Sequence, residues 1–172
     1  AGTAFTIKAT AAEKGAFSRS DFPLSSVIDT IGADDVMVCD LRGHRVSTMG
    51  GLGAIGMQLR GAAGMVIDGG VRDAEQIRSV GFPSYVRHVC ATSGMTRVKW
   101  LAINVPIEID KVSICPGDIV VADDTSVAVV PAAKARDILD KCQQREKLEM
   151  QFEEGLRKGE TFAALSKRLG IL

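Results

Sequence analysis

The chain of 172 residues contains few of the side chains that build metal clusters. It has two histidines and four cysteines. The cysteines form no C-x-x-C pair, and they are Cys39, Cys90, Cys115 and Cys142. A zinc site built from Cys and His needs such spacing, so none is expected. The pattern instead predicts small buried hydrophobic residues in a reducing compartment.

The sequence also lacks an excess of charge and any long apolar run. Lys plus Arg and Asp plus Glu both count 21, so the net charge is zero and no basic stripe for a phosphate backbone is available. No apolar run approaches the roughly 18 residues of a membrane span. Residues 1–8 lack the basic-then-apolar pattern of a signal peptide. We therefore expect a cytoplasmic protein that binds neither nucleic acid nor a membrane.

What the chain does contain is typical of a globular protein. Hydrophobic residues make up 46% and charged residues 24% of it, which argues against disorder. A chain of this length can bury a full apolar core without disulfides. We predict a single domain over residues 1–172.

Many of the 18 glycines separate short runs rich in Val and Ile, a pattern typical of strands joined by tight turns. Strands are expected at 5–9, 36–39, 64–68, 82–86, 105–109, 112–114, 119–122 and 127–130. Helices are expected at 21–31, opened by Asp21 as a possible cap, and at 51–60, 73–80, 132–157 and 162–169. A βαβ-like unit is expected from the strand at 64–68, a loop at 69–72, the helix after it and the next strand. The expected fold class is therefore α/β.

The first candidate site is the segment Gly50-Gly51-Leu52-Gly53, at the entry to a predicted helix. Unpaired backbone N–H groups and the helix dipole favour an anion there, such as a carboxylate or a phosphate. The spacing matches neither the dinucleotide-binding fingerprint nor the P-loop. A tight turn with close helix packing would explain the same glycines.

The second candidate is the segment from Asp68 to Asp73, which follows a predicted buried strand. A carboxylate there suits Mg²⁺ or Mn²⁺, and Arg72 offers a bidentate fork for a substrate carboxylate. A purely structural alternative is equally specific. Asp73 would cap the next helix, with capping-box spacing to Gln76, Arg72 would pair with a neighbouring acid and Asp68 would close a turn.

Three further features have simpler explanations. The pair Asp123-Asp124 lies in a predicted hairpin turn, where such residues bond to the backbone. His44 follows a predicted strand, with no evident partner. Glu146 and Glu149 belong to the charged face of the last long helix.

These motifs occur in a recognisable order. Gly50 is followed by the run from Arg60 to Asp73, RGAAGMVIDGGVRD, and then by GFP at 81–83, NVPI at 104–107 and PGDIVVAD at 116–123. The set resembles the RraA-like family, which includes the 4-hydroxy-4-methyl-2-oxoglutarate/4-carboxy-4-hydroxy-2-oxoadipate aldolases. The likeness extends from Gly2 to about Gly159, and the family's N-terminal helical segment has no counterpart before it.

The resemblance implies a β/β/α swivelling-type domain, with central β-sheets flanked by helices and a long C-terminal helix. It also implies a homotrimer, which in the family can pair into a homohexamer. The activity implied is that of a lyase that depends on Mg²⁺ or Mn²⁺. Such an enzyme would cleave a 4-hydroxy-2-oxo acid by a retro-aldol reaction, or decarboxylate oxaloacetate, through a pyruvate enolate.

The resemblance also assigns roles to residues. Asp73 would ligate the metal, and Arg72 would bind the 2-oxo acid and stabilise the enolate. An acid on the C-terminal helix of a neighbouring subunit would approach the metal, and Glu149, or else Glu146, is its match. The pyruvate carboxylate would be held by the backbone of the cradle, Gly50, Gly51, Leu52 and Gly53.

The chain departs from the family at specific positions. Gly51 stands where the aldolases commonly carry Asp or Glu, an acid that assists proton transfer, and Met49 stands where the family has an aromatic residue. Two other functions therefore remain open. One is a non-catalytic binding module that regulates a ribonuclease or another protein, and the other is a non-catalytic subunit of a mixed ring.

Overall fold

The computed structural model describes residues 1–171, and the chain forms two compact units. Unit 1 is Ala1–Ala132 and unit 2 is Ala133–Leu172. Each is described by itself below. The expectation that the whole chain is one domain stays a prediction.

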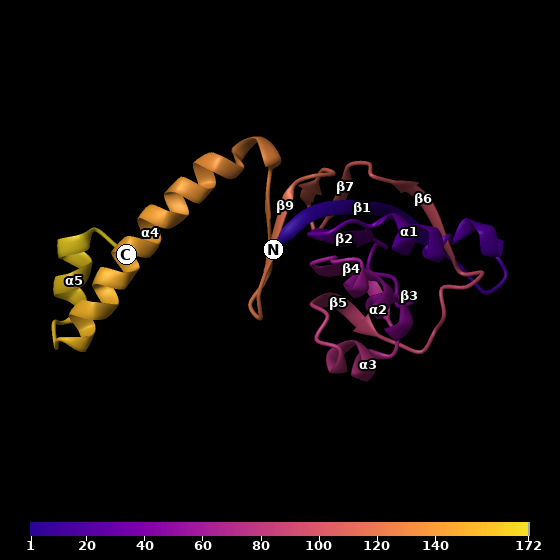
Figure 1. Ribbon diagram of the computed structural model, residues 1–172, viewed down its shortest axis with the longest axis horizontal. Coiled ribbons are helices and arrows are strands. Elements are labelled where there is room, and N and C mark those ends of the chain that lie inside the picture. The colour runs from indigo at the N-terminus through magenta and orange to yellow at the C-terminus, as the bar shows by residue number, and fades with distance from the viewer. Residues whose placement is uncertain (172) are drawn as a thin grey trace. The chain divides into compact units, whose positions relative to one another are not determined.

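The centre of unit 1 is a run of parallel strands (Figure 1). β1 (Gly2–Ala11) pairs with β2 (Asp35–Asp40), β2 with β4 (Gly64–Val71), and β4 with β5 (Ser84–Val89), all in parallel. The short β3 (Ser47–Met49) pairs with the end of β4. Between these strands the chain forms α1 (Leu24–Thr30), α2 (Gly51–Leu59) and α3 (Ala74–Ser79), so the expected βαβ connection from β4 through α3 to β5 is confirmed.

Antiparallel strands extend this sheet. β6 (Val98–Ile103) pairs with the second half of β1, β9 (Ile119–Ala122) pairs with its beginning, and β10 (Val127–Val130) pairs with β9. β7 (Ile107–Ile109) and β8 (Val112–Ile114) form a separate two-stranded sheet. The expected hairpin strands are confirmed, whereas β3 and β6 were not predicted.

The two faces of the parallel strands bury different partners, because successive side chains of a strand point to opposite sides. On one face Met65 and Ile67 pack with Met57 of α2 and Ile77 of α3. On the other face β2 and β4 pack against the β7–β8 sheet through Val36, Val38, Val66, Ile107 and Ile114. Helices thus cover one face and a second sheet covers the other, which confirms the mixed α/β class.

The beginning of α1 differs from the prediction. Asp21 does not cap this helix, since it ends a short 3-10 turn, Arg19–Asp21, and its carboxylate accepts hydrogen bonds from Ser18. These bonds, together with Lys99, lower the pKa of Asp21. The residue at the N-cap position of α1 is Pro23.

β4 also extends further than predicted, because it continues through the expected loop to Val71. Its two consecutive glycines reflect close packing rather than a turn. A Cβ on Gly69 would lie 2.7 Å from Cδ2 of Leu41, and one on Gly70 would lie 2.7 Å from Sγ of Cys90. The two glycines, which predicted a loop, are therefore explained by the close approach of other residues to the strand.

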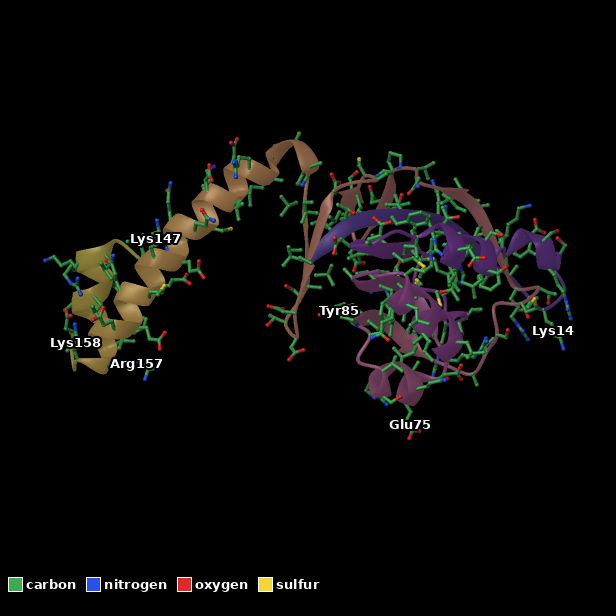
Figure 2. All side chains as sticks on the ribbon, in the orientation of Figure 1. Lys14, Glu75, Tyr85, Lys147, Arg157 and Lys158 are labelled. Carbon is green, nitrogen blue, oxygen red and sulfur yellow. The ribbon has the colours of Figure 1, made fainter. Side chains whose placement is uncertain are left out.

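Unit 2 consists of two contacting helices, α4 (Ala135–Arg157) and α5 (Phe162–Leu169), preceded by a 3-10 turn, Ala132–Lys134 (Figure 1). Phe152, Leu165 and Ile171 form their apolar contact. Figure 2 labels Lys147 and Arg157 on α4 and Lys158 just after its last residue. Arg157 pairs with Glu153 at 2.5 Å and Lys158 with Glu154 at 2.6 Å, as the i,i+4 spacing predicts. Over residues 1–171, no helix combines the length and apolarity needed to cross a membrane.

Candidate active site

The glycine-rich segment forms the first turn of α2. Gly50 is the N-cap residue, in an extended conformation with φ −136° and ψ −179°. The N–H groups of Gly51, Leu52 and Gly53 lie in the first turn, where a helix offers them no carbonyl partner. Leu52 is 81% exposed, whereas Gly50 and Gly51 are buried. We call the four residues Gly50–Gly53 the cradle.

Arg72 and Asp73 follow β4 and reach the cradle from the neighbouring strand. The N–H of Arg72 donates to the carbonyl of Met49 at 2.9 Å, which fixes the end of β4 beside the end of β3. The Gly51 N–H donates to Oδ2 of Asp73 at 3.1 Å. Nε of Arg72 lies 3.4 Å from the same oxygen, and both side chains are about half exposed. An ion pair this exposed contributes only about 0–1 kcal/mol, so it can rearrange around a ligand.

Asp73 has an unusual backbone for a residue with a side chain. Its φ is 56° and its ψ 36°, in the left-handed region, and it occupies the N-cap position of α3. Its carboxylate nevertheless makes no capping hydrogen bond with α3, so the capping-box prediction is wrong. The backbone conformation directs the carboxylate to Gly51 instead. Left-handed backbone costs roughly 1–2 kcal/mol, and strain of this kind is concentrated at functional sites.

Gly50 is a glycine because the two charged side chains lie against it. A Cβ at this position would lie 2.7 Å from Oδ2 of Asp73 and 3.0 Å from Nε of Arg72. The extended backbone itself would accept any residue. The two candidate sites of the sequence are therefore one site, in which a helix N-terminus, a guanidinium and a carboxylate converge.

A further side chain at this site, that of Gln76, was not predicted. Gln76 lies on α3, three residues after Asp73 and so on the same face of the helix. Its side chain covers Gly51 so closely that a Cβ there would overlap the Gln76 carboxamide. The signal in the sequence was the spacing from Asp73, which suggested a capping box.

Asp68 belongs to a different cluster. It is 7% exposed and accepts a hydrogen bond from the Gly43 N–H at 3.0 Å. It also pairs with Nε of Arg87, whose Nη2 lies 2.6 Å from Oδ2 of Asp110. The hydrogen bond to Asp68, followed by that to Asp110, raises the pKa of Arg87. Asp68 thus holds the loop after β2 and, through Arg87, is linked to Asp110 between β7 and β8, rather than closing a turn after its own strand.

This second cluster borders a cavity of about 860 Å³ in unit 1. Lys8, Asp40 and Asp68 lie in register on three adjacent strands. They share the cavity wall with residues from later elements, including Arg87, His88 and Glu108. No local sequence pattern predicts this convergence, because its members are up to a hundred residues apart and only the strand register aligns them.

The remaining candidates lie in a turn and in unit 2. Asp123 accepts hydrogen bonds from the N–H groups of Thr125 and Ser126, which confirms the turn interpretation and lowers its pKa. Glu149 lies on α4, where its Oε1 accepts a hydrogen bond from Arg145 at 3.0 Å. The roles expected for Glu149 and for Glu146 stay predictions.

The side chains around the cradle are compatible with one type of metal site. Among residues 1–171, no group of three or more His, Cys, Asp and Glu side chains is placed to hold an ion. Asp73, however, presents a half-exposed carboxylate with one oxygen bonded to Gly51. Mg²⁺ is usually held by one or two carboxylates together with water and substrate oxygens. The site therefore fits a hard divalent ion that a ligand helps to bind.

The fold and this site define a mixed α/β protein with a glycine-rich helix N-terminus beside an Arg-Asp pair. Comparison with known proteins shows the family to which the chain belongs. The family model described as "RraA-like: Aldolase/RraA" matches residues 1–129, and the chain belongs to the RraA-like family.

Individual relatives agree. The chain is 34% identical over 114 residues to a Halalkalibacterium halodurans protein named "Putative 4-hydroxy-4-methyl-2-oxoglutarate aldolase", a match that covers 65% of this chain and 53% of that protein. A Pseudomonas syringae protein of uncharacterised function shares the fold with a TM-score of 0.87 at 26% identity, over 97% of this chain and 75% of that one.

A third relative is named for a different role. Streptomyces coelicolor RraAS2 is described as an unusual member of the RNase ES inhibitor RraA protein family. It matches with a TM-score of 0.76 at 29% identity, over 91% of this chain and 76% of that one. The chain spans between 23% and 56% of the length of the three curated relatives that it matches.

Proposed function

We propose that this protein is a divalent-metal-dependent lyase that breaks the C3–C4 bond of a small 2-oxo acid. The observation that carries the proposal is the convergence at Gly51, whose N–H bonds to Asp73 beside Arg72. Membership of a family with an aldolase relative supports the same reaction class.

The cradle would bind the carboxylate of the 2-oxo acid. The first-turn N–H groups of Leu52 and Gly53 point out of the helix end, and the dipole of α2 favours an anion there. Gly50 leaves the space in which Arg72 and Asp73 approach this turn. The substrate carboxylate would then lie beside both charged side chains.

Arg72 would stabilise the charge that develops in the reaction. Breaking the C3–C4 bond leaves an electron pair that moves onto the C2 oxygen. A guanidinium fixed close to that oxygen stabilises the negative charge, an effect worth about 3–4 kcal/mol for a single well-placed donor. The Met49 carbonyl holds the backbone of Arg72 at 2.9 Å and so positions the residue.

Asp73 would hold Mg²⁺ or Mn²⁺, and Glu149 of a neighbouring subunit is the proposed second acid. A metal bound there would act as a Lewis acid on the substrate oxygens. The left-handed backbone of Asp73 keeps the carboxylate directed to the cradle rather than to its own helix. A shared site of this kind requires the homotrimer or homohexamer that the family suggests, and a cytoplasmic location is part of the same proposal.

The test is pyruvate release, coupled to lactate dehydrogenase, from oxaloacetate and from 4-hydroxy-4-methyl-2-oxoglutarate. Assays with Mg²⁺, with Mn²⁺ and with EDTA are compared, and the rate of the free metal ion is subtracted. We expect metal-dependent release that Arg72→Ala abolishes while the oligomer stays intact. Release from neither substrate would refute the proposal.

A second candidate function rests on the missing acid at Gly51 and on the relative named as a member of an RNase inhibitor family. In this case the protein would bind a ribonuclease without chemistry of its own. Purified ribonuclease from the same source, assayed with and without this protein, tests it. Unchanged ribonuclease activity at a large excess would reject it.

A further inference from the structure

The cavity of about 860 Å³ lies on the face of the parallel sheet that the helices do not cover. Asp40 and Asp68, which line it, point to the same side of the sheet as Val38 and Val66, two residues earlier on β2 and β4. Those two valines pack against the β7–β8 sheet, whereas α2 packs against the opposite face. The cavity is therefore separate from the cradle, which begins α2.

Asp40 carries a carboxylate that is almost fully buried but only partly hydrogen-bonded. The residue is 6% exposed, and its Oδ1 accepts the N–H of Arg42 at 3.0 Å. Among residues 1–171, no hydrogen bond reaches Oδ2 and no cation pairs with Asp40. Within the same residues, Nε1 of Trp100 is the one side-chain polar atom that is enclosed without a partner. Oδ2 of Asp40 is thus not sealed in the core, and it opens into the cavity that Asp40 lines.

The other charged groups of the cavity wall have both signs. Arg87 pairs with the two other aspartates of the wall, so those charges are balanced within the protein. Lys8 lies in register with Asp40 on the neighbouring strand β1. In the described part of the chain, four charged side chains of the wall form no ion pair, two cations and two anions: Lys8, Arg42, Asp40 and Glu108.

This mixture of charges determines the class of ligand that fits. A free carboxylate oxygen favours an ammonium group, which donates up to three hydrogen bonds. A ligand with an ammonium group alone would be repelled by Lys8, because neighbouring strands lie only about 4.8 Å apart. A ligand with a carboxylate alone would be repelled by Asp40 and Glu108. A small zwitterion satisfies both signs.

We infer that this cavity is a binding site for a free α-amino acid. The ammonium group of the ligand donates to Oδ2 of Asp40, and its carboxylate bonds to Lys8 and Arg42. An α-amino acid carries both charged groups on one carbon atom, which matches an anion and a cation in register on neighbouring strands. A cavity of about 860 Å³ has room for its side chain as well. The site is independent of the proposed lyase reaction.

Isothermal titration calorimetry with the full chain tests the site. The probes are free alanine, serine, leucine, glutamate and lysine. Ethylamine and propionate, which are alanine without its carboxylate and without its ammonium group, are the single-charge controls. We expect at least one of the amino acids to bind with a Kd of about 1 mM or lower. Each single-charge control should bind at least about ten times more weakly than alanine, because it loses a charge-assisted hydrogen bond.

Three variants locate the binding. Asp40→Asn keeps an oxygen for the N–H of Arg42 and should weaken amino-acid binding by about tenfold or more. Lys8→Met should weaken amino-acid binding but strengthen ethylamine binding, because the repelling cation is gone. Asp110→Asn is the matched control. It removes the same charge from the same cavity, but from an exposed carboxylate that Arg87 already holds, so the Kd should change by less than about twofold.

Three results would overturn the inference. One is the absence of binding by every probe amino acid at about 10 mM, which would mean that Oδ2 of Asp40 faces only water. Another is a Kd that Asp40→Asn leaves unchanged, which would place the ligand elsewhere. The third is equal affinity for alanine and ethylamine. Urea unfolding checks that each variant is folded, and if Asp40→Asn is not, the opposite shifts expected for Lys8→Met decide the question.

Discussion

Gly50→Ala is the substitution that tests the geometry of the site most selectively. Gly50 has an extended backbone, so alanine fits without backbone strain. The new methyl group would lie 2.7 Å from Oδ2 of Asp73 and 3.0 Å from Nε of Arg72. Both atoms are at the far ends of half-exposed side chains, which can move away. The perturbation therefore falls on the charged groups and not on the core.

The size of the effect follows from these distances. Carbon and non-bonded oxygen or nitrogen atoms normally stay about 3.3 Å apart or more, so both side chains must move by several tenths of an ångström. Misplacement of catalytic groups by about 1 Å can cost 10²-fold in rate. We expect kcat/KM to fall by about 10- to 100-fold. Stability should change by less than about 1 kcal/mol, since the Arg72–Asp73 pair is exposed.

The assay is metal-dependent pyruvate release, with urea unfolding as the measure of stability. Gly56→Ala, on the same helix but next to Ile28, is the matched control and should keep its activity within about twofold. A Gly50→Ala protein with wild-type kcat/KM would refute the view that Arg72 and Asp73 act at the cradle. A large loss of stability would show that the substitution acts through folding.

Three further predictions concern stability. Burial, with Asp40 and Asp68 nearby, raises the pKa of the Cys39 thiol from 9.0 to about 12. The folded protein keeps this proton above pH 9, where the unfolded chain loses it. The contribution of Cys39 to stability should therefore be fully present below pH 9, and the free energy of unfolding should fall by up to about 1.4 kcal/mol per pH unit as the pH rises towards 12. Urea unfolding between pH 8.5 and 10.5 should show this slope and Cys39→Ala should lack it, whereas equal slopes would contradict the assignment. Arg87→Leu leaves the buried Asp68 without its cation and should lower the free energy of unfolding by about 2–3 kcal/mol. Asp110→Asn, whose carboxyl is exposed, should lower it by less than about 0.5 kcal/mol. Chemical denaturation compares the two variants, and equal losses of stability would contradict this prediction. Gly155→Ala places a methyl group against Leu165, so it should loosen the contact between α4 and α5 and speed hydrogen exchange of the α5 amides. Unchanged exchange rates would show that this contact is not tight.

The sequence predicted the parts of the fold that depend on local patterns. Short apolar runs located β2 and β4, and the helix expected at 132–157 is α4. It also placed Arg72 and Asp73 after a buried strand, beside a glycine-rich helix start. The structure brings these residues together at Gly51.

Long-range packing explains what could not be predicted. The glycines at 69 and 70 resembled a loop because their close neighbours, Leu41 and Cys90, are distant in sequence. Asp73 resembled a helix cap because its spacing to Gln76 fits one, but a left-handed backbone turns the carboxylate to Gly51. The proximity of Gln76 to Gly51 depends on how α2 packs against α3, and no local pattern encodes it.

The most direct test of the account compares pyruvate release from oxaloacetate by the wild type and by Asp73→Asn, over a range of Mn²⁺ concentrations. Asparagine keeps the shape of the side chain and is a weaker ligand for a hard cation. We predict that the variant loses activity at low Mn²⁺ and regains part of it at high Mn²⁺, with unchanged unfolding behaviour. An Asp73→Asn protein with the wild-type rate and the wild-type Mn²⁺ dependence would contradict a metal-dependent site at Asp73.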